Sequence, residues 1–434
     1  MANPRHMAVK LLCKTFSEGS FSNIQLNSGL KNSDLDERDK KLCSAIYYGV
    51  IERKIYLDYV IRQFSSRPPE KLDDIVLNIL RSGIYQILFM DNVPDSAAVN
   101  ESVRLAKKFG KTSASGMINA VLRNFIRNGK TVALPKDKIY AYSVKYSAPP
   151  ELVGSLVNDY GWELADNLLS DALGSPPVTV RMNTLKCSED EFLDSLGKIK
   201  AEKSGILSEC FMLSGGDVTA TEAFGKGFFH VQDLASQLCC MALAPTENDI
   251  VLDICSAPGG KTFTMAQLMN GRGKIMAFDL HEKRVRLIRD GAERLGISNV
   301  SASVGDASKY NAELPKFTKI LCDVPCSGIG AIRRKPEIKY KDFGDFSGLP
   351  EIQYNIAENA LNYLDVGGEL VYSTCTLRKA ENEQVVEKLL SNHPEIEPVR
   401  LTEPLGEKFG SSADIFPCHF GSDGFFIAKF RKVR

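Results

Sequence analysis

Hydrophobic residues recur at helical spacing from about residue 4 to residue 130, with almost no strand-like alternation. Segments such as KKLCSAIYYGVIERKIYLDYVIRQF and DDIVLNILRSGIYQILFM keep this periodicity along their whole length. Apolar positions three and four residues apart form one face of a helix, and that face must be buried against another element. The pattern therefore predicts an N-terminal, all-α helical bundle over residues 1–135.

The pattern changes near residue 135, where TVALPKDK is rich in proline and polar residues. Residues 145–225 contain two short helical patterns and then PPVTVRMN, a β-branched run opened by prolines. We expect a small α/β middle domain over this range. An N-terminal extension of the next domain is the alternative.

From residue 250 onward, nearly continuous apolar runs alternate with helical segments. The runs are DIVLDIC, GKIMAFDL, VSASVGD, FTKILCDVP and GELVYSTC. Strands of this kind are typical of a parallel sheet covered by helices on both faces, so we expect a doubly wound α/β domain over residues 226–434. Ligands of such sheets bind beyond the carboxyl ends of the strands, and the residues that end these runs are the candidate site.

Composition narrows the class of protein. A chain of 434 residues is long enough for two or three domains, and no apolar run approaches the roughly 20 residues that cross a bilayer. The N-terminus, MANPRHMAVKLL, lacks the pattern of a secretory signal, so we expect a cytoplasmic protein with no membrane partner. The 11 cysteines form no Cys-x-x-Cys pair and no zinc-type cluster, and we expect no metal.

Two stretches are basic although the formal net charge is zero. Between residues 96 and 130 a single acid, Glu101, stands against seven basic residues: Arg104, Lys107, Lys108, Lys111, Arg123, Arg127 and Lys130. This stretch indicates either a solvated helix face or a surface for RNA. Beside Cys326, GIGAIRRKPEIKYK sets Glu337 against Arg333, Arg334, Lys335, Lys339 and Lys341. A basic loop there favours contacts to the phosphates of a polyanionic substrate over a solvated loop.

The run DIVLDI is followed by a glycine-rich turn, CSAPGGKT. It is not a phosphate-binding loop, because Cys255 stands where the first glycine is required, and the dinucleotide fingerprint is also absent. Such a turn lets a ligand approach the backbone closely, and the helix N-terminus after it suits a carboxylate. Asp279 and Asp306 end the next two runs, where they can meet ribose hydroxyls and an adenine amine; helix capping is the alternative. Together these features favour an adenosine-type ligand without phosphates.

Two cysteines stand just beyond the carboxyl ends of further runs, Cys326 after Pro325 and Cys375 after Thr374. A thiolate is required when the carbon to be modified is not nucleophilic, as with C5 of a pyrimidine. Attack at C6 makes an enamine whose C5 can take an electrophilic methyl group. Inert buried thiols and a regulatory disulfide are the alternatives. The residues alone do not say which cysteine attacks.

These stretches carry a family resemblance. DICSAPGGKT, AFDL, GDAS, DVPCSGIGAIRRKPEIKY and STCTLRKAENE, in this order and spacing, resemble the motifs of the RNA (cytosine-5)-methyltransferases that use S-adenosylmethionine. RMNTLK at 181–186, VQDLAS at 231–236 and DGFFIAKF near the C-terminus resemble further stretches of that family. The N-terminal region resembles the NusB-type RNA-binding fold, a combination typical of the members that act on small-subunit ribosomal RNA. The resemblance covers nearly the whole chain.

The resemblance implies a multidomain fold with a NusB-like RNA-binding domain, a small α/β middle domain and a Rossmann-like methyltransferase domain. It also implies that S-adenosylmethionine methylates C5 of a cytidine in small-subunit (16S) ribosomal RNA, through a covalent bond between a cysteine and C6. The enzyme is expected to be a monomer without a metal. The target base must be unstacked for a thiolate to reach C6.

Residue roles follow from the same resemblance. Cys375 is the expected nucleophile, and Cys326 is expected to assist release of the product. Asp279 would hold the ribose, Asp306 the adenine, and Asp323 would lie between cofactor and target base. The cofactor turn would comprise Cys255, Ser256, Ala257, Pro258, Gly259, Gly260 and Lys261. Ser256 stands where many relatives have alanine, a change that puts nothing essential in doubt.

Two rival functions remain at this point. A methyltransferase that acts on transfer RNA would share every catalytic motif, and the NusB-like region favours ribosomal RNA only by analogy. An RNA-binding assembly factor with an inactive catalytic domain would require a broken motif, and none of the motifs is broken.

Overall fold

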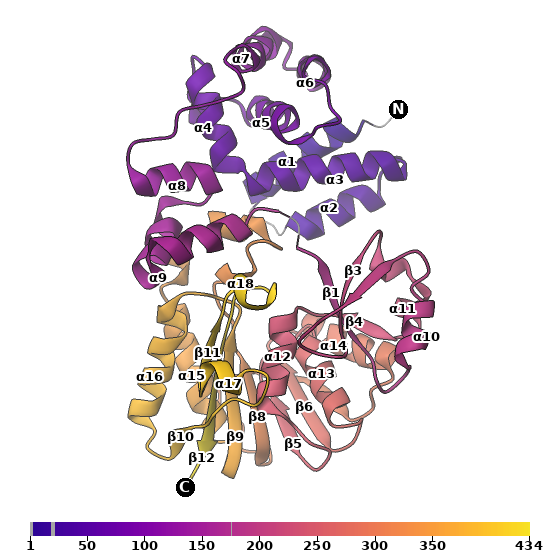
Figure 1. Cartoon of the computed structure of the whole chain (residues 1–434), viewed down its shortest axis with the longest axis vertical. Coiled ribbons are helices and arrows are strands. Elements are labelled where there is room, and N and C mark those ends of the chain that lie inside the picture. Colours follow the sequence, from indigo (N-terminus) through magenta and orange to yellow (C-terminus); the bar gives the residue numbers. More distant parts are fainter. Residues whose placement is uncertain (1–2, 19–21, 175) are drawn as a thin grey trace. The chain divides into compact units, whose positions relative to one another are not determined.

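The chain divides into two compact units, each described by itself. The computed structural model describes residues 3–18, 22–174 and 176–434. The helical unit comprises Met1–Gly174 and Ile332–Lys341, and the sheet unit comprises Ser175–Ala331 and Asp342–Arg434. Figure 1 shows helices in the first and two sheets in the second. The division into three domains expected from the sequence, with boundaries near residues 135, 145 and 225, stays a prediction.

The N-terminal region is helical throughout, as its periodicity predicted. Short polar side chains begin several helices: Asp36, Asp73 and Asp137 accept hydrogen bonds from backbone N–H groups in the first turns that follow them. Apolar side chains from the first seven helices share one core. The helices are α1 (Pro4–Glu18), α2 (Ser22–Lys31), α3 (Glu37–Glu52), α4 (Lys54–Phe64), α5 (Asp74–Phe89), α6 (Asp95–Lys108), α7 (Ser115–Arg127), α8 (Lys138–Tyr146) and α9 (Pro150–Asp171).

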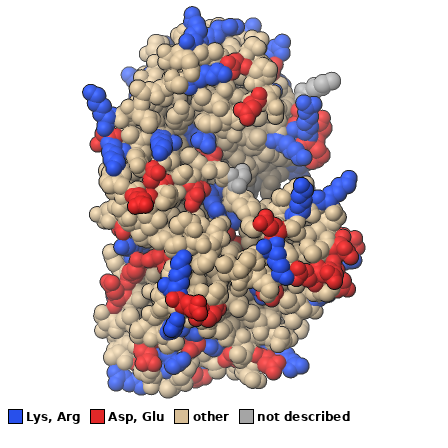
Figure 2. Space-filling model, in the orientation of Figure 1, with Lys and Arg blue, Asp and Glu red and all other residues tan. Residues whose placement is uncertain are grey.

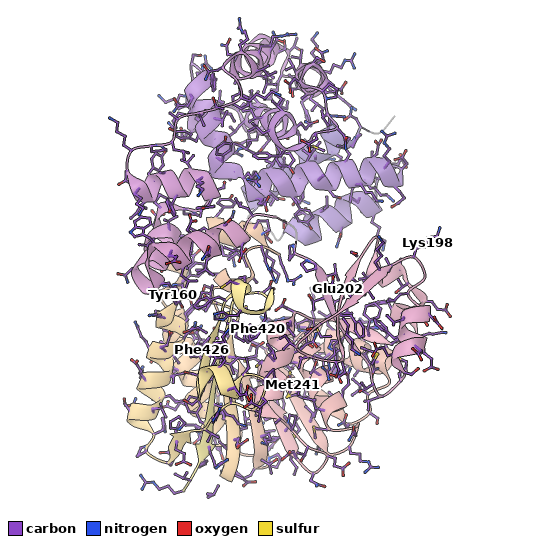
Figure 3. All side chains as sticks on the ribbon, viewed as in Figure 1. Tyr160, Lys198, Glu202, Met241, Phe420 and Phe426 are labelled. Carbon is purple, nitrogen blue, oxygen red and sulfur yellow. The ribbon has the colours of Figure 1, made fainter. Side chains whose placement is uncertain are left out.

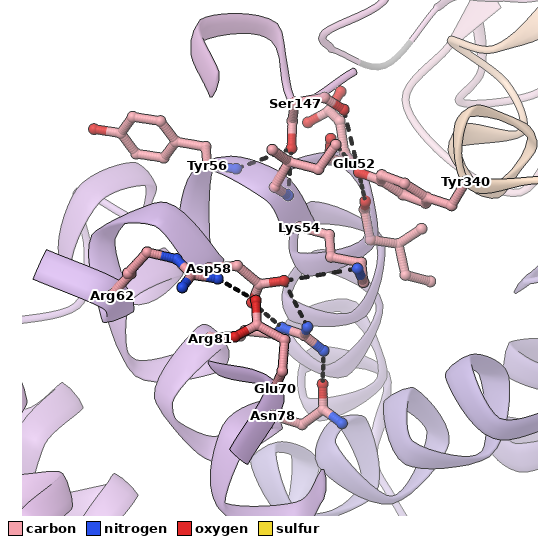
Figure 4. A network of polar contacts seen from close by, with 12 residues as sticks. Glu52, Lys54, Tyr56, Asp58, Arg62, Glu70, Asn78, Arg81, Ser147 and Tyr340 are labelled. Carbon is pink, nitrogen blue, oxygen red and sulfur yellow. Dashed lines mark hydrogen bonds and ion pairs between the residues drawn. The ribbon is translucent and has the colours of Figure 1, made fainter. Parts of the chain in front are cut away.

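A buried ion pair joins α4 to α5 in this unit (Figure 4). Arg81 is 5% exposed and donates to both carboxylate oxygens of Asp58, at 2.6 and 2.7 Å, and to Asn78 at 3.0 Å. A two-pronged arginine–carboxylate contact fixes direction as well as distance. The hydroxyl of Ser147 accepts from the backbone N–H groups of Ile55 and Tyr56, which ties the end of α8 to the start of α4.

The sheet unit begins with a small antiparallel sheet in the order β2-β3-β1-β4. Its strands are β1 (Val178–Met182), β2 (Lys200–Lys203), β3 (Cys210–Ser214) and β4 (Phe229–Val231), with α10 (Glu189–Asp194) and α11 (Glu222–Gly225) between them. Phe192 of α10 packs against Phe211 and Phe229, with ring centroids 5.0 and 5.8 Å away. The strand β1 lies within the predicted run PPVTVRMN.

The large sheet has the order β10-β12-β9-β8-β5-β6-β7, and β11 pairs with β12. The five predicted runs form β5 (Ile250–Asp253), β6 (Lys274–Asp279), β7 (Val300–Val304), β8 (Phe317–Asp323) and β9 (Leu364–Thr374), which are parallel to their neighbours within this set. β12 (Phe425–Lys432) is antiparallel to β9, and it also pairs with β10 (Ile396–Pro398) and β11 (Ser412–Ile415). The predicted parallel sheet thus becomes a mixed sheet at one edge.

Helices cover both faces of the large sheet. Successive residues of a strand point to opposite faces, so neighbouring apolar residues of one strand belong to two different cores. Val251 faces the core formed with α12 (Leu234–Leu243), α13 (Gly260–Leu268) and α14 (Glu282–Leu295). Leu252 faces the core formed with α15 (Leu349–Leu361) and α16 (Glu383–Asn392). Met241 and Phe426, labelled in Figure 3, belong to the first and the second core. The doubly wound architecture is confirmed.

The chain order changes direction between two central strands. From β5 the chain continues through β6 to β7 on one side, and it then crosses to β8 on the other side of β5. In open α/β sheets such a switch point opens a crevice beyond the carboxyl ends of the two strands.

No helix in the described ranges is long and apolar enough to span a bilayer.

Candidate active site

The predicted site residues gather at one edge of the large sheet. β5 ends at Asp253, β6 at Asp279, β8 at Asp323 and β9 at Thr374. These strands are parallel, so the residues that follow them leave the sheet at the same edge. This edge includes the switch point, where a ligand is expected.

The turn after β5 is held to β6. Ser256 donates both its N–H and its hydroxyl hydrogen to the carbonyl oxygen of Phe278, at 2.8 and 2.9 Å. Gly259 has a φ of +107°, and a Cβ there would lie 2.4 Å from the ring of Phe263, so the position requires glycine. The hydroxyl that Ser256 carries in place of the alanine of many relatives therefore helps to anchor the turn.

Two clefts adjoin this turn. The first has a volume of about 530 Å³ and a mixed polar and apolar lining, with the start of α13 in its wall; its lining includes Gln232, Asp233, Ser236, Asp253, Cys255, Ser256, Ala257, Pro258, Gly260, Lys261 and Asp323. The second, of about 540 Å³, has apolar and aromatic walls; its lining includes Leu252, Ile254, Phe278, Asp306, Ala307, Tyr310, Leu314 and Tyr363. An apolar slot with a few polar groups suits a purine, and a helix N-terminus suits a carboxylate.

Asp279 is 5% exposed and already engaged. One carboxylate oxygen accepts from the N–H of His281 at 3.1 Å, and the other lies 3.1 Å from the guanidinium of Arg284. Arg284 also donates to the carbonyl of Ala257 in the turn, at 3.1 Å. The aspartate is therefore joined to the cofactor turn through a partly exposed arginine, which a ligand hydroxyl can join or displace.

Asp306 lies in a turn between β7 and β8, so it does not cap a helix, and its predicted contact with adenine stays a prediction. It lines the second cleft, and one of its carboxylate oxygens also accepts from the N–H and the hydroxyl of Ser308, at 3.1 and 2.7 Å. The other oxygen pairs with Lys309 at 3.0 Å. The hydrogen bond from Ser308, followed by the contact with Lys309, lowers the pKa of Asp306. The side chain is thus a turn-stabilising carboxylate in the wall of the cleft.

Asp253 is fully buried at the end of β5 and lines the first cleft. One carboxylate oxygen accepts from the hydroxyl of Thr262 at 2.6 Å, and the other has no hydrogen-bond partner among the described residues. Burial raises the pKa of Asp253 to about 7. The sequence placed this residue at the edge and gave it no role, because burial and a missing partner cannot be read from residue order.

Lys261, in the first turn of α13, forms an ion pair with Asp323 at the end of β8. The ammonium lies 2.7 Å from one carboxylate oxygen, and the hydroxyl of Ser373 donates to the other at 2.9 Å. Burial alone would lower the pKa of Lys261, but the charge of Asp323, the neighbouring thiol of Cys239 and the hydrogen bond to Asp323 together outweigh it and raise that pKa. Lys261, predicted as part of the cofactor turn, is thereby also the partner of the carboxylate expected near the target base.

The two predicted thiols meet at the same edge. The sulfur atoms of Cys326 and Cys375 lie 3.3 Å apart, and both residues are partly exposed. The hydrogen bond between the sulfurs, and then burial, raise the pKa of the Cys326 thiol well above its ordinary value. Cys326 therefore retains its proton beside Cys375. The structure thus brings the two predicted thiols into contact at the ligand edge of the sheet.

The basic run after Cys326 does not face a substrate as a whole, which corrects the sequence-based expectation for Lys339. Lys339 is 1% exposed within the helical unit, where its ammonium donates to the carbonyl oxygen of Glu52 at 2.8 Å and burial lowers its pKa to about 7. Tyr340 donates to the carbonyl of Ile51 at 2.7 Å (Figure 4). Lys335 and Lys341 are exposed. Part of the segment 332–341 is therefore packed into the helical unit, because Pro336, Ile338 and Lys339 are buried there.

The basic stretch of the helical unit lies mainly on α6 and α7. Figure 2 shows lysine and arginine side chains outnumbering acidic ones over the end of the molecule where Figure 1 places these helices. Arg104 pairs with Glu101, Lys111 with Asp73 and Lys130 with Asp95. Lys107 and Lys108 are exposed in the last turn of α6.

Within the described residues, no group of three or more His, Cys, Asp or Glu side chains could hold a metal ion.

Comparison with known proteins agrees with this site. Residues 240–431 match the family model described as 16S rRNA methyltransferase RsmB/F, and residues 2–127 match the NusB family. A probable ribosomal RNA small subunit methyltransferase B from Bacillus subtilis is 36% identical over 440 residues, which cover 99% of this chain and 98% of the relative. The corresponding protein of Synechocystis is 32% identical over the full length of both chains.

A solved structure extends the agreement to the fold. The crystal structure of PH0851 matches 100% of this chain and 99% of its own, with a TM-score of 0.84 and 24% identity. The relatives above show more than the fold. The chain belongs to the ribosomal RNA small subunit methyltransferase B family and is an S-adenosylmethionine-dependent ribosomal RNA methyltransferase.

Proposed function

We propose that the chain transfers a methyl group from S-adenosylmethionine to C5 of a cytidine in small-subunit ribosomal RNA, through a covalent bond between Cys375 and C6. The observation that carries this proposal is the pair of thiols, 3.3 Å apart at the ligand edge of the sheet. Methylation of a nitrogen or a ribose oxygen requires no thiolate, whereas C5 of a pyrimidine becomes nucleophilic once a thiolate adds to C6.

The residues at the edge fit S-adenosylmethionine. The apolar second cleft with Asp306 would hold the adenine, and Asp279 lies at the end of β6, between the two clefts in strand order, for the ribose. The first cleft offers the N-terminus of α13 to a carboxylate, and to an ammonium group the oxygen of Asp253 that has no partner among the described residues. The bound cofactor supplies an electrophilic methyl group.

In this proposal Cys375 begins the reaction. Its thiolate adds to C6, and the electron pair of the C5–C6 double bond moves to C5. C5 takes the methyl carbon as the carbon–sulfur bond of the donor breaks. Loss of the C5 proton to a base restores the double bond and expels the sulfur of Cys375. Cys326 retains its proton and lies 3.3 Å away, so it can stabilise the negative charge that returns to Cys375.

Asp323 would select cytosine. Asp323 lies three positions before Cys326 and pairs with Lys261. It also accepts a hydrogen bond from Ser373, which lies two positions before Cys375 near the end of β9. Cytosine presents an amino group at C4 where uracil presents a carbonyl oxygen, and a carboxylate accepts from the first and repels the second. The target base must leave its stack to reach this edge.

The helical unit would contribute RNA affinity through α6 and α7. Phosphate contacts supply sequence-independent binding and orient the RNA, while the sheet edge reads the base. A ribosomal RNA substrate implies a cytoplasmic site of action.

The test is to incubate the protein with methyl-labelled S-adenosylmethionine and unmodified small-subunit ribosomal RNA, to digest the RNA to nucleosides, and to identify the labelled one. We expect 5-methylcytidine, and no label with Cys375→Ala. Label in another nucleoside, or equal labelling by the variant, would overturn the proposal. Transfer RNA in a parallel reaction tests the substrate class.

A further inference from the structure

We propose that two adjacent buried residues, Glu381 and Asn382, are positioning residues that hold the two cysteines separately: Glu381 holds the loop of Cys326, and Asn382 holds the loop of Cys375. This inference rests on the proposed function, because it assigns each residue to one step of the C5 reaction. Both side chains have 0% exposure, and their hydrogen bonds with the cysteine loops involve the flanking residues of each cysteine.

Glu381 holds one neighbour of Cys326 directly and the other through Gln353. One of its carboxylate oxygens accepts from the N–H of Ser327 at 2.8 Å, and the same oxygen accepts from the side chain of Gln353 at 3.0 Å. The same Gln353 nitrogen donates to the carbonyl of Pro325 at 2.9 Å. Pro325 and Ser327 flank Cys326 in the sequence, so the carboxylate and the amide together fix the backbone on both sides of that thiol.

Asn382 holds both neighbours of Cys375. Its side-chain oxygen accepts from the hydroxyl of Thr374 at 2.6 Å, and its nitrogen donates to the carbonyl of Thr376 at 3.1 Å. An asparagine supplies one acceptor and one donor, which matches these two partners in direction. A single side chain therefore spans the backbone around the second thiol.

The pair is itself held rigidly. Arg378 donates to the second carboxylate oxygen of Glu381 at 2.9 Å, and the hydroxyl of Tyr372 donates to its carbonyl at 2.6 Å. Ser327 and Thr376 also share a hydrogen bond of 2.7 Å between their hydroxyl groups, which joins the two loops directly. Because Glu381 and Asn382 are consecutive, the planar peptide bond between them sets the separation of their Cα atoms, and the two clamps start from adjacent backbone positions.

A buried network could also serve stability alone, so the test uses the two chemical steps as separate readouts. A displacement of about 1 Å at a reacting group can cost about 10²-fold in rate. Loosening the Cys326 loop should slow release and leave attack intact, whereas loosening the Cys375 loop should slow attack itself. A loss of folding would instead reduce both steps and cofactor affinity together.

The experiment compares Glu381→Met with Asn382→Leu in the full chain, on small-subunit ribosomal RNA with S-adenosylmethionine. For Glu381→Met we expect turnover to fall about 10²-fold while a covalent protein–RNA band accumulates on a denaturing gel. For Asn382→Leu we expect a similar loss of turnover with no accumulated band. Both variants should bind the cofactor as the wild type does. The matched controls, Glu387→Met and Asn355→Leu, change exposed side chains of α16 and α15 and should leave both readouts unchanged.

Further variants keep the result decisive. Gln353→Met removes the hydrogen bond to Pro325 and leaves Arg378 paired, so it should reproduce the trapped band if Glu381→Met does not fold. Glu381→Met added to Cys326→Ala should trap no more adduct than Cys326→Ala alone. Parallel loss of band, turnover and cofactor binding in both variants, or wild-type behaviour in both, would overturn the inference. If the wild type itself forms no 5-methylcytidine and Cys326→Ala traps no RNA, the proposed function fails instead.

Discussion

The sulfur atoms of Cys326 and Cys375 lie 3.3 Å apart although 49 positions separate the two residues in the sequence. They reach this distance because β8 and β9 are neighbouring parallel strands, with Asp323 opposite Ser373 in the register. Each cysteine follows the end of its strand by one to three residues, so the sheet itself delivers both thiols to one place.

The first prediction concerns these thiols. Cys375→Ala should lower methyl transfer by at least about 10³-fold and abolish the covalent adduct, because it removes the nucleophile. Cys326→Ala should still form the adduct and fail to release it, which gives a slow protein–RNA band on a denaturing gel. If Cys375→Ala formed that band and Cys326→Ala did not, the two roles would be exchanged.

The second prediction concerns base selection by Asp323. Asp323→Asn should lower kcat/KM by about 10- to 10²-fold, the discrimination that one well-placed base contact provides. The amide still accepts one hydrogen bond, but it loses the charge that pairs with Lys261. Asp290→Asn, at an exposed position of α14, is the control. An Asp323→Asn enzyme with unchanged kcat/KM would show that this carboxylate does not contact the base.

The third prediction concerns pH. The pKa of Asp253 is raised to about 7 from 3.8, so between these values the folded protein binds a proton that the unfolded chain has released. Stability must then fall as the pH rises from about 4 to about 7, by at most about 4 kcal/mol for this group, and stay level above that range.

Asp253→Asn removes this titration while keeping an acceptor for Thr262. Urea denaturation at pH 5 and pH 8 gives the unfolding free energy of each protein. From pH 5 to pH 8 the wild type should lose more unfolding free energy than the variant, so the variant should be relatively more stable at pH 8. A difference that is independent of pH would mean that Asp253 has an ordinary pKa.

The fourth prediction concerns RNA binding by α6. Replacing Arg104, Lys107 and Lys108 by alanine should weaken binding to all RNA sequences alike. The slope of log affinity against log salt should also become shallower, by about one for each phosphate that these side chains neutralise in the wild type. Lys339→Met is a matched control, because that lysine is buried and cannot reach a phosphate. An unchanged slope in the triple variant would make α6 a solvated helix face.

Several elements were predictable because they depend on local patterns. The five apolar runs formed β5 to β9, since a strand buried on both faces needs continuous apolar residues. The turn at Gly259 was predictable because consecutive glycines after a proline favour a tight turn, and glycine readily adopts the positive φ that the structure has there. The antiparallel β12 was not expected from periodicity, because pairing direction depends on how the chain returns to the sheet edge.

The contrast between Lys339 and Lys261 shows the limit of residue type as evidence. Both are lysines in motifs next to predicted site residues. Lys339 is buried against the carbonyl of Glu52, while Lys261 in the first turn of α13 pairs with Asp323 at the end of β8. Charge along the chain indicates that a cation is present, but only its surroundings determine what it faces.

The sequence by itself determined the helical N-terminal region, the doubly wound sheet and the identity of the residues at its ligand edge, because periodicity and strand ends are local properties of the chain. Tertiary structure alone decided the separation of the two sulfurs, the unpartnered oxygen of Asp253 and the way Glu381 and Asn382 hold the two cysteine loops. These are relations between segments that meet only after folding, and their energies depend on burial and on distances of a few ångströms that no spacing in the sequence records.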